Sequence, residues 1–176
     1  MNTATIKFYD IANGEGVRTS LFVSGCRHHC KNCFNYEAWD FSFGEPYTEG
    51  TEQKILESLA PDYISGLSVL GGEPMEPENQ AGVLALVKKV KERFPQKTVW
   101  IYSGFTWEEL MQGSRAATPL VREILQYTDV LVDGRFVEEK KNISLIFRGS
   151  ENQRVIDVQK TLASGKIALY IDIEGK

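Results

Sequence analysis

Apolar residues in this chain gather in short runs, separated by longer stretches with helical spacing. The run from Ser20 to Ser24 is nearly continuous, as expected of a strand buried on both faces. Similar runs cover residues 67–70, 98–102 and 130–133. The pattern therefore predicts four buried strands.

The stretches between these runs are predicted to be helical. Thr51 is placed to cap the first helix, which continues through Leu59 and stops near Pro61. Pro77 opens the longest helix, in which apolar residues recur every three or four positions up to Phe94. Two shorter helical segments are predicted at residues 107–111 and 120–127.

Strands that alternate with helices predict an α/β fold, in which right-handed crossovers build a parallel sheet. The rhythm weakens after Gly134, where residues 138–141 carry balanced charges and indicate a solvated turn. The apolar run at residues 167–171 is a candidate closing strand. No repeat or low-complexity linker divides residues 1–176, so one domain is expected.

Composition narrows the function classes. The chain has 176 residues, 42% of them apolar, which is enough to bury a core. A net charge of -4 and a pI near 5.3 argue against a general nucleic-acid binder, which would carry a basic stripe. The first residues have no long apolar core, so neither a signal peptide nor a membrane span is predicted, and a cytoplasmic protein with reduced thiols is expected.

The three cysteines of the chain are the strongest chemical signal. Cys26, Cys30 and Cys33 all lie within one stretch of eight residues, and such clustering indicates a metal site. A cubane iron–sulfur cluster that only transfers electrons takes four thiolates, one for each iron. The spacing here supplies three, which leaves one iron able to bind a small molecule and do chemistry on it.

A zinc site is the main alternative for these thiols. Adding His28 or His29 would complete a Cys3His set. Structural zinc sites usually draw their ligands from two separate segments, however, and no second cysteine or histidine pair exists in the chain. A disulfide is disfavoured because three is an odd number and no secretory segment precedes the cysteines.

A second motif, Gly71-Gly72-Glu73-Pro74, follows the strand predicted at residues 67–70. Two glycines let a backbone approach a ligand closely, and a carboxylate can accept hydrogen bonds from an ammonium group. Alone, the motif would indicate an ordinary turn. Its position after a strand makes it a candidate binding segment for an amino group.

The cysteine spacing and the glycine motif together resemble those of the radical S-adenosylmethionine (SAM) enzymes. The resemblance implies an incomplete, laterally open (β/α)6 barrel and one 4Fe-4S cluster with the ligands Cys26, Cys30 and Cys33. It also implies that the methionine part of SAM chelates the fourth iron. Reductive cleavage of SAM would then give a 5′-deoxyadenosyl radical.

Five further stretches are informative: Asn13 to Arg18, Leu21 to Cys26, Cys33 to Trp39, Val130 to Phe136 and Phe147 to Arg154. They resemble one family, the activating proteins of anaerobic ribonucleotide reductases. They lie in family order and together span most of residues 6–157. No recognised motif covers residues 158–176, and their role is unknown.

The resemblance implies a SAM site built from three segments, with no protein side chain as the catalytic group. Contacts to the adenine are implied for Asn32, Cys33 and Phe34, and contacts to the methionine end for Gly71, Gly72 and Glu73. Asp133 and Arg135 resemble an acid-x-base pair whose cation meets the SAM carboxylate. A strand-ending turn is the alternative for that last segment.

The implied activity is that of a radical SAM oxidoreductase acting on a protein. Its substrate would be one glycine in the large catalytic subunit of class III ribonucleotide reductase, which loses a hydrogen atom and becomes a glycyl radical. An electron donor such as flavodoxin is implied, whereas nucleic acid and membranes are not expected as partners.

Three alternatives remain open. The pyruvate formate-lyase activase and 7-carboxy-7-deazaguanine synthase types share the cysteine spacing and the glycine motif. The late Arg-Gly-Ser-x-Asn-Gln stretch at residues 148–153 favours the reductase activator over both. A metal-binding adaptor without enzymatic activity is the third.

Overall fold

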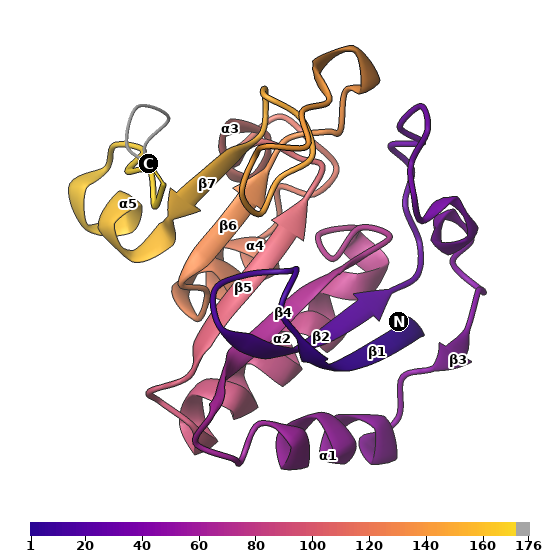
Figure 1. Cartoon of the computed structure of the whole chain (residues 1–176), viewed down its shortest axis with the longest axis vertical. Helices are drawn as coiled ribbons and strands as arrows, with labels where there is room; N and C mark the ends of the chain where they lie inside the picture. Colours follow the sequence, from indigo (N-terminus) through magenta and orange to yellow (C-terminus); the bar gives the residue numbers. More distant parts are fainter. Residues whose placement is uncertain (172–176) are drawn as a thin grey trace.

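The computed structural model describes residues 1–171 and is centred on a mixed seven-stranded sheet with the order β3-β1-β2-β4-β5-β6-β7 (Figure 1). The strands are β1 (Asn2–Asp10), β2 (Val17–Val23), β3 (Glu45–Pro46), β4 (Ile64–Gly71), β5 (Thr98–Ser103), β6 (Val130–Asp133) and β7 (Arg154–Asp157). The four central strands β2, β4, β5 and β6 are parallel. β1 and β7 run antiparallel to their neighbours.

The α/β class predicted from the sequence is confirmed, but a barrel is not. The sheet is open, and β3, β1 and β7 flank the parallel strands instead of further β/α units. The reason is local. β1 returns directly into β2 as a hairpin, and β7 pairs with β6 over only four residues. Among residues 1–171, the β/α repeat is therefore limited to the four central strands.

Residues 1–171 also form five α-helices and two 3-10 turns. They are α1 (Glu49–Ser58), α2 (Pro77–Arg93), α3 (Trp107–Met111), α4 (Pro119–Gln126) and α5 (Val158–Ser164), with η1 (Tyr36–Trp39) and η2 (Glu138–Lys140). α2 begins at Pro77 as predicted. The predicted cap of α1 is wrong: Thr48 is the N-cap, because its hydroxyl accepts a hydrogen bond from the backbone N–H of Thr51.

The main core lies between one face of the sheet and the helices α1, α2 and α4, of which α2 and α4 lie behind the sheet in Figure 1. Side chains alternate between the two faces of a strand. On β5, Val99 and Ile101 belong to this core. Trp100 and Tyr102 belong to a smaller cluster on the opposite, helix-free face.

On the helix-free face a buried cation ties the central strands together. The Arg18 guanidinium of β2 donates to the Ser68 hydroxyl and the Leu67 carbonyl of β4, and to Thr98 of β5. The Trp100 ring lies 5.4 Å from the guanidinium carbon. Arg18 is fully buried, so these contacts make it a structural residue of the sheet.

The end of the described chain lies near this cluster. The Tyr170 ring packs edge-on against Trp100, with the centroids 5.3 Å apart. The closing strand predicted at residues 167–171 reduces to a single bridge between Leu169 and Ile156. Residues 172–176, the end of the segment of unknown role, lie outside the described residues. None of the helices among residues 1–171 combines the length and the apolar character needed to span a bilayer.

Candidate cluster and ligand site

The three cysteines lie in the loop that leaves the end of β2. The loop begins where the backbone N–H of Gly25 donates to the Ala38 carbonyl, and that of Cys26 to the Trp39 carbonyl. Cys33 donates its backbone N–H to the Cys30 carbonyl, which closes a tight turn. Cys26 is buried, and Cys30 and Cys33 are half-buried.

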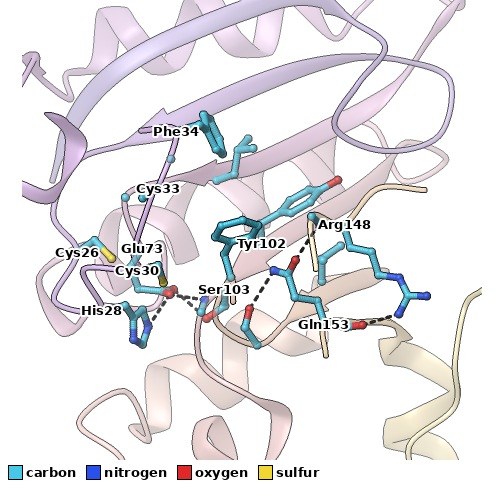
Figure 2. A pocket seen from close by; sticks show the side chains of 18 of the residues that line it. Cys26, His28, Cys30, Cys33, Phe34, Glu73, Tyr102, Ser103, Arg148 and Gln153 are labelled. Atoms are coloured by element: carbon cyan, nitrogen blue, oxygen red, sulfur yellow. Dashed lines mark hydrogen bonds and ion pairs between the residues drawn. The ribbon is translucent and has the colours of Figure 1, made fainter. Parts of the chain in front are cut away.

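All three cysteines line one cavity of about 490 Å³ on the helix-free side of the sheet (Figure 2). Six of the predicted ligand-binding residues line the same cavity: Asn32, Cys33, Phe34, Gly71, Gly72 and Glu73. Asp133 and Arg135 are not among its lining residues, although Gly134 between them is. Residues 71–74 are called the glycine turn below. The structure thus brings the cysteine loop and the glycine turn together, as expected of parallel strand ends that share an edge.

The glycine turn is held to the cysteine loop by its backbone. The N–H of Gly72 donates to the Val23 carbonyl at 2.7 Å, and that of Glu73 donates to the Gly25 carbonyl at 2.8 Å. A Cβ on Gly72 would lie 2.7 Å from the carbonyl oxygens of both Gly25 and Ala38. Glycine is therefore required here for the packing of three backbone segments, beyond any need to admit a ligand.

The carboxylate of Glu73 is fully buried, and protein donors surround it. Oε1 accepts hydrogen bonds from the Ser103 hydroxyl at 2.9 Å and the Met75 N–H at 2.8 Å. Oε2 accepts the Gly104 N–H at 2.6 Å and faces Nε2 of His28 at 3.1 Å. The side chain thus joins the glycine turn to the end of β5 and to the cysteine loop.

His28, which the sequence suggested only as a possible zinc ligand, lies in this site. Its Nδ1 accepts a hydrogen bond from Nε of Arg135 at 3.0 Å, because a guanidinium can only donate. Nε2 therefore carries the proton that is donated to Glu73. Arg135 also donates to Glu109 at 3.0 Å, so it contacts the cysteine loop and the start of α3.

Asp133, which was predicted to lie at the SAM carboxylate, is surrounded by protein donors. Its buried carboxylate accepts hydrogen bonds from Arg154 at 2.5 and 3.0 Å and from the Trp107 N–H at 2.7 Å. Arg154 also donates to Glu108. Asp133 therefore joins the ends of β6 and β7 to the start of α3.

The late motif has an architectural role that its sequence did not reveal. The Gln153 side chain donates to the Gly134 carbonyl and accepts the backbone N–H groups of Gly149 and Ser150. Arg148 donates to the Gln153 carbonyl at 2.6 Å (Figure 2). These bonds hold the loop after β6 along one wall of the cavity.

Burial sets the protonation of the thiols. Burial raises the pKa of the Cys26 thiol to about 12 and also raises that of Cys30. Thiolates bind iron and zinc, so metal binding must displace these protons. Among residues 1–171, no three cysteine, histidine or carboxylate side chains converge as a single metal ion would require, so no zinc site is preformed there.

Three thiols in one loop are the donor set that a cluster with three cysteine ligands would need. They lie at one end of a cavity whose remaining wall carries the glycine turn and apolar side chains such as Phe34 and Phe147. Tyr102 adds a polar group that sequence reasoning missed: its hydroxyl is buried, and among residues 1–171 it has no hydrogen-bond partner. Its position at the C-terminal end of a parallel strand was the available signal.

A comparison with protein families matches this region. The sequence profile of a family described as a 4Fe-4S single cluster domain matches residues 12–156. That range contains the three cysteines, the glycine turn and the late motif.

Curated relatives are similar over most of the chain. The relative from Pasteurella multocida (strain Pm70) is 45% identical over 152 residues, 84% of this chain and 93% of its own. That from Vibrio cholerae is 44% identical, over 82% and 90%. That from Escherichia coli (strain K12) is 39% identical, over 83% and 92%. Each of the three is named anaerobic ribonucleoside-triphosphate reductase-activating protein.

Proposed function

This chain belongs to the family of anaerobic ribonucleoside-triphosphate reductase-activating proteins, and we propose that it activates that reductase with one 4Fe-4S cluster and SAM. The observation that carries the proposal is the shared cavity. Three thiols and a glycine turn, on neighbouring parallel strand ends, line one space of about 490 Å³. Three thiolates satisfy three irons of a cubane, so the fourth is available to SAM.

The chain's own residues have separate tasks in this proposal. Cys26, Cys30 and Cys33 hold the cluster, and Gly71, Gly72 and Glu73 form the wall for the methionine end of SAM. Asn32 and Phe34 lie where the adenine would be bound. Once reduced by an external donor, a cluster held there would supply the one electron that splits SAM into methionine and a 5′-deoxyadenosyl radical, and this radical would take a hydrogen atom from a glycine of the reductase.

The segment around β6 enters the proposal in a revised form. Arg135 remains a proposed contact of the SAM carboxylate, because it donates to His28 of the cysteine loop and is partly exposed. Asp133 is assigned to holding Arg154 and the start of α3. Arg135 would therefore contact SAM, and Asp133 would fix the end of β6, from which Arg135 projects.

The partner in this proposal is the large catalytic subunit of the anaerobic reductase, and the electron donor is a small redox protein such as flavodoxin. Among residues 1–171, no α-helix contributes a lining residue to the cavity, which supports access by a segment of a protein substrate. The four parallel strands β2, β4, β5 and β6 would supply only part of an open radical SAM barrel.

Anaerobic reconstitution with iron and sulfide tests the cluster. We expect about four irons per chain, as for one cubane, and cleavage of SAM to 5′-deoxyadenosine once a reductant is added. Alanine at Cys26, Cys30 or Cys33 should abolish cleavage. Binding of one zinc per chain without iron would contradict the proposal and favour the adaptor.

Isotope transfer tests the partner. The unlabelled reductase should show a glycyl doublet in electron paramagnetic resonance (EPR). The reductase with a deuterated glycine should yield deuterated 5′-deoxyadenosine, since abstraction needs near-contact between the reacting atoms. A full radical yield with unlabelled nucleoside would exclude direct abstraction. Turnover of a free pterin-like substrate in place of the protein would favour the synthase type.

A further inference from the structure

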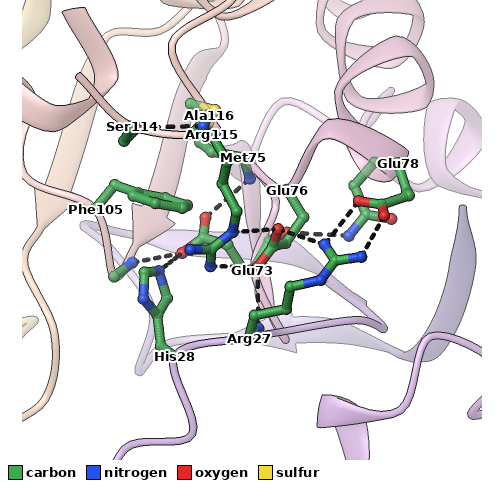
Figure 3. A network of polar contacts seen from close by, with 12 residues as sticks. Arg27, His28, Glu73, Met75, Glu76, Glu78, Phe105, Ser114, Arg115 and Ala116 are labelled. Atoms are coloured by element: carbon green, nitrogen blue, oxygen red, sulfur yellow. Dashed lines mark hydrogen bonds and ion pairs between the residues drawn. The ribbon is translucent and has the colours of Figure 1, made fainter. Parts of the chain in front are cut away.

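Two buried carboxylates bind neighbouring residues of the cysteine loop. Glu73 belongs to the glycine turn and Glu76 lies three positions later, and both side chains are almost fully buried. Glu73 binds His28, and Glu76 binds Arg27 (Figure 3). These two partners are consecutive and lie between the first two cysteines, so both carboxylates act on the same short piece of chain.

Glu76 is held from two sides by arginines. Its oxygens accept hydrogen bonds from the backbone N–H and guanidinium of Arg27, at 3.0 and 2.8 Å. They also accept a pair of bonds from Arg115, at 2.9 and 2.7 Å. Although burial alone would raise the pKa of Glu76, the bonds from both arginines outweigh it and lower that pKa. The carboxylate therefore stays ionised between two cations.

The position of Glu76 shows that this side chain is not needed by its own helix. It is the N-cap residue of α2, yet it makes no capping hydrogen bond there. Cap side chains normally accept from the first free N–H groups of a helix. Here the carboxylate turns away from α2 toward the cysteine loop and toward Arg115, from the segment between α3 and α4.

Phe105 connects the two carboxylate sites. Its ring meets the His28 ring edge-on at a centroid distance of 4.4 Å. The guanidinium carbon of Arg115 lies 4.7 Å from the centroid of the same ring. Gly104 leaves room for His28, since a Cβ there would lie 2.5 Å from its ring. The loop after β5 is thus shaped around the histidine.

We infer that Glu73 and Glu76 form a carboxylate clamp that fixes the Cys26–Cys30 segment against the glycine turn, with Arg27, His28 and Arg115 as positioning residues. The inference rests on the proposed function, because the two clamped segments are those assigned to the cluster and to SAM. Replacing residues that hydrogen-bond to metal ligands and orient them typically changes metal affinity or activity by about 10- to 100-fold.

The test uses Glu76→Gln in the full chain, because the amide keeps the shape but presents donors to two arginines. We expect hydrogen–deuterium exchange at residues 26–33 of the metal-free protein to accelerate at least about tenfold. In the reconstituted protein, the SAM concentration that half-converts the EPR signal of the reduced cluster should rise by about tenfold or more. Gly104→Ala, which displaces His28 without altering either carboxylate, should change both readouts in the same direction.

Glu52→Gln is the matched control. Glu52 is also buried and ion-paired, with Lys89 of α2, but it lies on α1. The Glu52→Gln variant should lower overall stability without accelerating exchange at residues 26–33 or weakening SAM binding. If Glu76→Gln and Gly104→Ala match the parent in exchange at residues 26–33, or if Glu52→Gln accelerates it equally, the clamp is refuted. A parent protein that binds no SAM would overturn the proposed function, while the exchange data would still decide on the clamp.

Discussion

Arg154 binds Asp133 across the antiparallel pair of β6 and β7, with guanidinium-to-carboxylate distances of 2.5 and 3.0 Å. The two residues are direct partners in the strand register. Asp133 is buried, and its carboxylate accepts hydrogen bonds from this one arginine and from the N–H of Trp107. The end of β6, from which Arg135 projects toward the cysteine loop, is fixed by a cross-strand ion pair.

Arg154→Ala should strongly destabilise the protein. Removing one partner of a buried pair leaves an uncompensated charge and typically costs about 3–5 kcal/mol of unfolding free energy. Because Arg154 is partly exposed, we expect a value near the lower end, about 3 kcal/mol, from urea unfolding of the metal-free protein. Lys31→Ala removes the exposed ion pair with Glu139 and should leave the unfolding free energy nearly unchanged. Equal losses for the two variants would contradict this assignment.

Arg154 also makes the unfolding free energy depend on pH. The hydrogen bonds from Arg154 lower the pKa of Glu108 from 4.5 to about 2. A carboxylate whose folded pKa is depressed stabilises the fold above its unfolded pKa and loses that contribution as the pH falls. The stability difference between the parent and Glu108→Gln should therefore be constant above pH 4.5 and shrink toward pH 2. A difference that stays constant down to pH 2 would show that the pair does not form in solution.

Gly72→Ala should disturb both halves of the site at once. The new Cβ would lie 2.7 Å from the Gly25 and Ala38 carbonyl oxygens, so the backbone before Cys26 must move. We expect weaker SAM binding, an altered cluster EPR spectrum, and a loss of about 1–3 kcal/mol in unfolding free energy from overpacking. Gly50→Ala is the control: it lies in α1 with its nearest atom at 3.6 Å, and it should be neutral or slightly stabilising. An unchanged spectrum in Gly72→Ala would mean that the turn adapts without moving the cysteine loop.

Tyr102→Phe separates ligand binding from folding. The Tyr102 hydroxyl has no partner among residues 1–171, so its removal breaks no hydrogen bond within them. We expect the unfolding free energy to change by less than about 0.5 kcal/mol. If the hydroxyl binds SAM, the dissociation constant should rise about fivefold, as one hydrogen bond is worth about 1 kcal/mol. Isothermal titration with SAM measures this effect, and an unchanged affinity would remove Tyr102 from the SAM site.

The strands and helices with a strong local pattern were predictable. The bounds of β6 agree with the predicted run at residues 130–133, and α2 begins at Pro77. β1 was not predicted, because apolar and polar residues alternate irregularly along this half-exposed strand. β7 was not predicted either, because it has only four residues, with a charged residue at each end.

Only the cysteine and glycine motifs of the site could be predicted, because their residue types and spacing are themselves informative. Cysteines and glycines have restricted uses, so their clusters indicate chemistry directly. The partners of His28 and Glu76 could not be inferred, because Arg27 and Glu76 are 49 positions apart and Arg135 and His28 are 107 apart. Arginine and glutamate are common surface residues, and only the folded structure shows which of them are buried together.

The backbone bonds from Gly72 and Glu73 to Val23 and Gly25 extend the pairing of β2 with β4 beyond the strand ends. Strand register, and not the connecting chain, thus sets how the cysteine loop faces the glycine turn. The connection through α1, residues 47–63, adds no lining residue to the cavity. Insertions and deletions in that connection would leave the two motifs aligned, so length variation among related chains can accumulate there at little cost to the chemistry.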